Sequence, residues 1–218
     1  MDTLKKALEG FKPSSEAELD EWFKGLAVAF LYGGYISVSD YKEERYRIFI
    51  RTVEFYCHYE GNIEKDMPKD PIVYHRNGKY VEGEVPYFPL MSFHAHASGY
   101  DITFENFDLK LRSSALIRAY EVYDVARNTY LHYDREKKLF VSCKDIKYRV
   151  NKQSTFLYNF LNGFSDNNIK WIDTLRNKSE GFKIAPRQNV YLYDEDENKL
   201  STKDTRLWSF TRKEEIPD

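Results

Sequence analysis

The chain has 218 residues, of which 42% are hydrophobic, 31% charged and 17% aromatic, which is the composition of a globular protein and excludes a disordered or low-complexity one. The 33 Lys and Arg residues face 35 Asp and Glu residues, so the formal charge is −2. This balance excludes a protein whose net charge attracts it to nucleic acid, so any nucleic-acid contact must come from a local basic patch.

The N-terminal stretch MDTLKKALEGFKPSSEAELDEW lacks the apolar core of a secretory signal, and no apolar run is long enough to span a membrane. The two cysteines, Cys57 and Cys143, have neither the spacing of a metal-ligand pair nor that of a disulfide framework. We therefore expect a cytoplasmic protein that does not associate with membranes and in which both cysteines fill core space.

The first predicted element is a helix over residues 14–31, with Ser14 or Ser15 as its N-cap and an end near Gly33-Gly34. Its apolar residues recur at helical spacing: Leu19, Trp22, Phe23, Leu26, Ala27 and Phe30. Strand-like patterns follow at residues 46–59, 99–109 and 114–125, with a looped connection around 79–89.

A second helix is predicted from Gln153 to Leu161, stopped by Asn162-Gly163, and a strand with an acidic turn is predicted over 190–201. The sequence contains no repeat and no Gly/Ser-rich linker at which the chain would divide. We therefore expect residues 1–218 to form one domain.

The strand RTVEFYCHYEG, residues 51–61, carries an acid, Glu54, within an apolar and aromatic run. Strand alternation places Glu54 on one face with Ile48, Ile50, Thr52 and Tyr56, where a carboxylate needs a partner. Two interpretations follow from these residues. Glu54 is either a general base in a partly desolvated site or the acid of a structural ion pair with Arg47, Arg51 or a residue on the next strand.

Six segments, in this order along the chain, resemble those of one enzyme family: LAVAFLYGG (26–34), VEFYCHYEG (53–61), DPIVYH (70–75), SALIRAYE (114–121), IAPRQNV (184–190) and TRLWSF (205–210). The family is that of the alkyladenine (3-methyladenine) DNA glycosylases. The resemblance implies an α+β fold with a mixed, largely antiparallel sheet flanked by helices. It also implies a monofunctional hydrolase of DNA repair that excises bases, needs no cofactor and has damaged DNA or a modified nucleobase as its partner.

Carried over residue by residue, the resemblance implies that Glu54 activates a water against C1′ of the damaged nucleotide and that Arg118 helps to position this water. Tyr56 and His75 would stack on a base flipped out of the duplex. His96 and Phe93 are further candidate substrate contacts.

The chain departs from the family before Gly99, where the family has a tyrosine-rich segment that supplies a stacking ring and a wedge into the DNA. Residues 92–99 read SFHAHASG here, which leaves Phe93 or Met91 as candidate wedges. The stretch HAHASGYDITF also resembles uncharacterised Bacteroidota proteins. The alternative function is therefore a non-catalytic protein of the same fold that binds a nucleobase or small ligand.

His94 and His96 lie two residues apart and would share a strand face, so both could bind one metal with Asp101, His75 or His58. We expect no metal, and the competing interpretation is that both histidines form hydrogen bonds at a pocket wall. Asp101 is expected to order the loop around Gly99 by accepting backbone N–H bonds. Residues 144–152, 176–178 and 186–189 offer basic and aromatic side chains that could line a phosphate-binding face.

Overall fold

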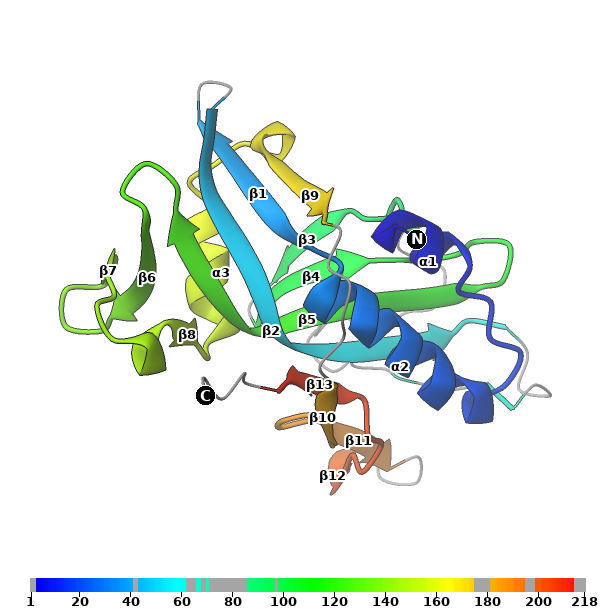
Figure 1. Cartoon of the computed structure of the whole chain (residues 1–218). Coiled ribbons are helices and arrows are strands. Elements are labelled where there is room, and N and C mark those ends of the chain that lie inside the picture. The colour runs from blue at the N-terminus through cyan, green and yellow to red at the C-terminus, as the bar shows by residue number, and fades with distance from the viewer. Residues whose placement is uncertain are drawn as a thin grey trace.

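The structure is a computed structural model, which describes residues 3–40, 43–61, 66–67, 70, 86–96, 98–174, 181–194 and 199–213, with the backbone alone at 192–194 and 199–202. The chain is α+β, with few helices and a curled antiparallel sheet (Figure 1). The helices are α1 (Leu4–Glu9), α2 (Glu16–Tyr32) and α3 (Ser154–Leu161), with short 3-10 turns η2 (Ile146–Tyr148) and η3 (Asp166–Asn168).

The central path of the main sheet has the strand order β10-β13-β2-β5-β4-β3. β1 joins β2 to β9, β6 joins β5 to β7, and β8 pairs with β5, whereas β11 and β12 form a separate hairpin. The bounds are β1 (Gly34–Asp40), β2 (Glu43–Tyr59), β3 (Phe93–His96), β4 (Gly99–Thr103), β5 (Leu111–Asp124), β6 (Thr129–Asp134), β7 (Leu139–Ser142), β8 (Val150–Asn151), β9 (Ile169–Asp173), β10 (Phe182–Ala185), β11 (Tyr191–Asp194), β12 (Lys199–Lys203) and β13 (Ser209–Arg212).

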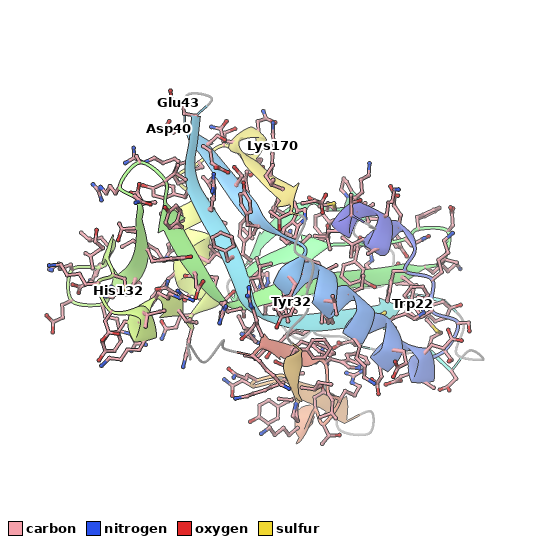
Figure 2. The ribbon with its side chains drawn as sticks, in the orientation of Figure 1. Trp22, Tyr32, Asp40, Glu43, His132 and Lys170 are labelled. Atoms are coloured by element: carbon pink, nitrogen blue, oxygen red, sulfur yellow. The ribbon has the colours of Figure 1, made fainter. Side chains whose placement is uncertain are left out.

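All pairings among the described strands are antiparallel. The expectation of an α+β chain with a largely antiparallel sheet is confirmed, whereas the parallel pairs of a mixed sheet are not found in the part of the chain that is described. The long strands β2 and β5 form the spine of the sheet (Figure 1). β1 extends β2 on its other edge, and Figure 2 shows Asp40 and Glu43 at the outer end of the β1–β2 ladder.

Helix α2 confirms the first predicted element. Ser15 is its N-cap, Ser14 donates backbone and hydroxyl hydrogen bonds to Glu18, and Gly33 ends the helix. Its buried face packs on β2 and β13 (Figure 1), and Phe23 stacks on Phe55 with ring centroids 4.7 Å apart. Burial of this aromatic face is what places β2 and β13 side by side beneath the helix. None of the described helices is long and apolar enough to cross a membrane.

Helix α3 confirms the second predicted helix and ends at Asn162. It packs on β4 and β5, where Gly99 comes so close to Ser154 that a Cβ at position 99 would meet the Ser154 hydroxyl oxygen at 1.8 Å. Gly99 also has a φ of +147°, so the position requires glycine for its backbone as well as for space.

The predicted strands 46–59 and 114–125 are confirmed as parts of β2 and β5, whereas the strand predicted over 99–109 ends at Thr103. The strand expected after residue 190 is β11, but the acidic turn that follows lies outside the described residues. Most of the loop predicted around 79–89 also lies outside them, and residues 86–89 are irregular. The sequence did not predict α1 or the short strands β1, β6, β7, β9, β10 and β13.

Two successive irregularities in the β2–β5 ladder change the side-chain pattern near Glu54. Ile50 pairs with Tyr120, Thr52 with Ala119 and Val53 with Ile117, so Arg51 and Arg118 each stand without a partner in the register. The core face of β2 therefore switches from Ile48 and Ile50 to Val53, Phe55 and Cys57. The prediction that Glu54 shares a face with Ile48 and Ile50 is wrong, because simple alternation does not hold across a β-bulge.

Candidate active site

Glu54 lies on the sheet face opposite the main core and is completely buried. Its neighbours on this face are Tyr56 on the same strand and Leu116, which is its register partner on β5. Tyr56 and Leu116 pack together with Val190 in a small apolar cluster. The site thus combines a carboxylate with an apolar wall, where electrostatic interactions are stronger than in water.

Three described donors hold the Glu54 carboxylate. The Nε of Arg118 donates to Oε2 at 2.6 Å, the Tyr56 hydroxyl donates to Oε2 at 3.2 Å, and the backbone N–H of Gln188 donates to Oε1 at 2.8 Å. Glu54 therefore does form an ion pair with a residue of the next strand, whereas Arg47 pairs with Glu44 instead. A carboxylate offers about four acceptor positions, so the described donors occupy all but about one of them.

Arg118 is the bulged residue of β5, and its guanidinium links Glu54 to the loop before β11. Its Nη2 donates to the backbone carbonyl of Gln188 at 3.2 Å and lies 3.4 Å from the Tyr56 hydroxyl. Burial alone would lower the pKa of Arg118, but Tyr56 and Glu54 raise it above its ordinary value. Burial, reinforced by the charge of Glu54, raises the pKa of Tyr56 as well, so Tyr56 stays a neutral hydrogen-bond donor.

A buried ion network fixes the backbone at Gln188. The neighbouring Arg187 side chain is fully buried and contacts the carboxylates of Asp70 at 2.5 Å and Asp204 at 2.6 Å. Its Nη1 also donates to the backbone carbonyl of Phe55 at 3.3 Å, and its guanidinium lies 4.4 Å from the ring centre of Tyr56. The network ties together three distant segments of the chain, and the Gln188 N–H is thereby held against Glu54.

The histidines of the HAH motif lie on the same sheet face, because His94 pairs with Asp101 and Asp101 pairs with Leu116 across β4. The Nε2 of His96 lies 3.2 Å from Asp101, and the Ser114 hydroxyl donates to the same carboxylate oxygen at 3.2 Å. Asp101 thus binds side chains here rather than the backbone N–H groups that the sequence led us to expect.

His94 packs against Phe88, with ring centroids 4.5 Å apart. The Nδ1 of His58 accepts the backbone N–H of Asp70 at 3.0 Å, so His58 is engaged away from the HAH motif. The described residues contain no group of three His, Cys, Asp or Glu side chains able to hold a metal. His75, the other candidate ligand and stacking residue, lies outside the described residues.

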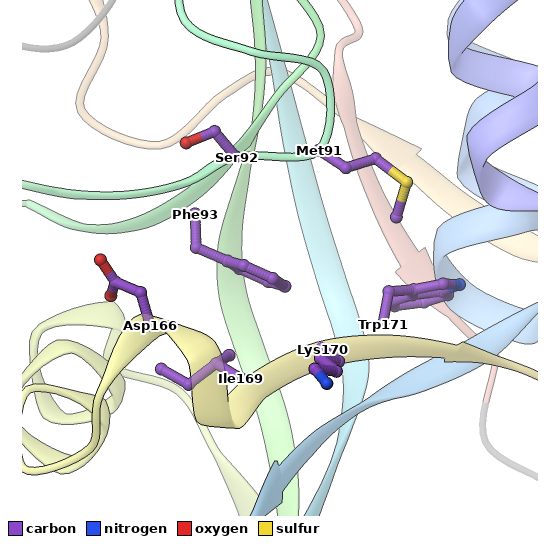
Figure 3. A pocket seen from close by; sticks show the side chains of 7 residues that line it. All are labelled: Met91, Ser92, Phe93, Asp166, Ile169, Lys170 and Trp171. Carbon is purple, nitrogen blue, oxygen red and sulfur yellow. The ribbon is translucent and has the colours of Figure 1, made fainter.

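Phe93 and Met91 line a different cavity, of about 480 Å³ (Figure 3). Its other lining residues include Asp166 and two residues of β9, Lys170 and Trp171. Phe93 pairs with Ile102, whose side chain belongs to the main core, so it points to the face opposite Glu54. The structure therefore brings together Glu54, Tyr56, Arg118 and the two histidines on one face, and it places Phe93 on the other.

A second cavity, of about 330 Å³, adjoins the Glu54 site on the side of Arg118. Its lining consists of Arg51, Thr52, Arg118, Ala119, Val150, Lys152, Gln188, Thr211 and Arg212. Arg118 and Gln188 form part of this wall and also bind Glu54, so the buried carboxylate is one side chain away from the cavity. Thr211 and Arg212 were not singled out from the sequence, and Arg51, expected as a possible partner of Glu54, lies near Glu121 instead, because bulges and distant strands bring these residues to this place.

Comparison with known proteins adds no relative to this description: no protein-family model, no curated protein and no solved structure matches the chain.

Proposed function

We propose that this protein is a monofunctional, glycosylase-like hydrolase that cleaves the N-glycosidic bond of a modified purine in DNA. The observation that supports the proposal is the hydrogen-bonded unit of Glu54, Arg118 and the Gln188 backbone, in which Arg118 and Gln188 line a cavity and Glu54 lies buried behind them. A carboxylate, a cation and a carbonyl that converge on one point are what a hydrolytic water needs for orientation and deprotonation. The segments around Glu54, Arg118 and Arg187 are also those that resemble the alkyladenine glycosylases.

In the proposed reaction, a water held by Glu54 and the Gln188 carbonyl attacks C1′ of the nucleotide. The C1′–N bond breaks, the purine leaves with the bonding electron pair and takes up a proton, and Glu54 receives the proton of the attacking water. Arg118 holds the Glu54 carboxylate in position while positive charge builds on the sugar. No metal and no lysine Schiff base is needed for this chemistry.

The direct test is single-turnover base release from duplexes that carry hypoxanthine, ethenoadenine or an alkylated purine, at low and moderate salt. We expect release by the wild type and a loss of about 10²–10⁴-fold in Glu54→Gln, since this is the usual contribution of a general base. Glu136→Gln is the matched control, because Glu136 is an exposed carboxylate in the β6–β7 turn. Release that survives Glu54→Gln, or no release from any of these duplexes, would refute the proposal.

A second function, a non-catalytic protein that binds a nucleobase or small ligand, is favoured by one specific observation. Glu54 is completely buried and already bound by three donors, and Tyr56 is 2% exposed with Arg187 over its ring. Groups so fully engaged are typical of a structural network. Retained binding of a modified base by a wild-type protein that releases none of it would establish this second function in place of the first.

A further inference from the structure

The cavity beside Arg118 has cationic side chains from four different elements. Arg51 comes from β2, Arg118 from β5, Lys152 from the segment before α3, and Arg212 from β13. No carboxylate lines this cavity among the described residues. Such a convergence of like charges raises the energy of an empty site and is relieved by an anion.

The two bulges of the β2–β5 ladder explain how two of these cations meet. Arg51 and Arg118 are the residues without register partners, and a bulge turns a side chain away from the regular alternation of its strand. Next to them, the hydroxyls of Thr52 and Thr211 form a hydrogen bond of 3.0 Å, which uses one of their two O–H groups and leaves the other as an additional donor. The bulges therefore bring hydrogen-bond donors of adjacent strands together at this cavity, which regular alternation along the strands would not do.

Nearby acids offset this charge only in part. Arg118 is paired with Glu54 at 2.6 Å, but Arg51 lies 3.8 Å from Glu121, which binds Arg149 more closely at 2.7 Å. Lys152 is exposed and has no ion pair among the described residues. A surplus of positive charge thus faces the cavity, although the whole chain has a formal charge of −2.

We infer that this cavity binds the phosphate group of a nucleotide whose base is handled at Glu54. Arginine guanidinium groups and hydroxyls are suited to phosphate oxygens, and a volume of about 330 Å³ suffices for a phosphate with part of its sugar. The inference rests on the proposed function for the identity of the base, whereas the binding of phosphate does not depend on hydrolysis.

The test compares two ligands that differ by one phosphate, inosine and inosine 5′-monophosphate, by isothermal titration calorimetry. An oligonucleotide with a single deoxyinosine forms a third arm and distinguishes a backbone phosphate from that of a free nucleotide. The proteins are the wild type, Lys152→Ala and Lys12→Ala, with Lys12 as an exposed lysine that does not line the cavity. Thermal melting checks that each variant is folded.

We expect the monophosphate or the oligonucleotide to bind at least about tenfold more tightly than inosine, because a charge-assisted contact is gained. Lys152→Ala should weaken this binding about tenfold, Lys12→Ala should leave it unchanged, and added inorganic phosphate should compete. Equal affinities for inosine and both phosphorylated ligands, or equal behaviour of the two lysine variants, would overturn the inference. Phosphate binding without base release would refute only the proposed hydrolysis, and base release without phosphate dependence would refute only the phosphate site.

Discussion

Replacement of Arg187 by leucine should be the most damaging single change near the site. The Arg187 side chain is fully buried between Asp70 and Asp204, and Arg206 approaches Asp204 at 2.9 Å but Asp70 only at 3.8 Å. Without Arg187, the one cation that the described residues leave near the buried Asp70 carboxylate is Arg206, at 3.8 Å. Removal of one partner from a buried ion pair costs about 3–5 kcal/mol, because the remaining charge is left uncompensated.

For a chain of this size, each kcal/mol corresponds to about 2–4 °C in Tm, so the expected loss is about 6–20 °C. Arg127→Leu is the control: its guanidinium is 63% exposed and lies 3.8 Å from Asp124, and exposed pairs contribute about 1 kcal/mol or less. Thermal melting and urea denaturation at pH 7 measure both variants. The double variant Arg187→Leu/Asp70→Asn should recover part of the loss, since it removes the stranded charge.

The pH dependence supplies an independent check. Burial works against ionisation of Asp204, but Arg187 and Arg206 hold its pKa below the ordinary value. The stabilisation is therefore present above a pH of about 4, the unfolded-state pKa, and is lost as the pH falls through the folded-state pKa. The difference in the free energy of unfolding between the wild type and Arg187→Leu should be largest at pH 7 and should become smaller in acid. A loss below about 1 kcal/mol, or a double variant no more stable than the single one, would refute the electrostatic account.

Three further outcomes are expected. Gly99→Ala should destabilise the protein by about 2 kcal/mol or more, because its Cβ would collide with Ser154. Gly25→Ala, on an open face of α2, should instead stabilise the protein by about 0.5–1 kcal/mol. Equal effects of the two substitutions on the free energy of unfolding in urea would contradict the close approach of Gly99 to Ser154. Phe23→Ala should cost about 3–5 kcal/mol, since its buried ring stacks on Phe55 and meets Trp208 edge-on, and a small loss would show that α2 contributes little to the core. EDTA treatment should leave the melting curve unchanged, and a clear decrease in Tm would instead support a metal at His94 and His96.

The elements with long periodic patterns were predictable from the sequence. Helices α2 and α3 follow the helical period and end at recognisable caps, and strands β2 and β5 contain long apolar and aromatic runs, although the bulges interrupt their alternation. The short strands β6, β7 and β9 were not predictable, because runs of four to six residues are too short to show a diagnostic period.

Only some side chains of the site could be predicted from the sequence. Glu54 and Arg118 were singled out, and they contact one another at 2.6 Å, which is the ion pair with the next strand that was the structural alternative for Glu54. The bulges at Arg51 and Arg118 could not be read from alternation, and a backbone donor such as the Gln188 N–H leaves no signal in side-chain chemistry. The Arg187 network joins residues more than 100 positions apart, which no local spacing reveals.

The most direct measurement of the central claim separates the chemistry of Glu54 from its structural role. Single-turnover base release, binding of a lesion-containing duplex and Tm would be measured together for the wild type and Glu54→Gln. The account predicts that release falls by about 10²–10⁴-fold while binding persists and the variant remains folded. Unchanged base release by Glu54→Gln would contradict the account. A wild type that releases no base, with a Glu54→Gln variant that differs from it only by a lower Tm, would also contradict the account and would leave Glu54 as a structural residue.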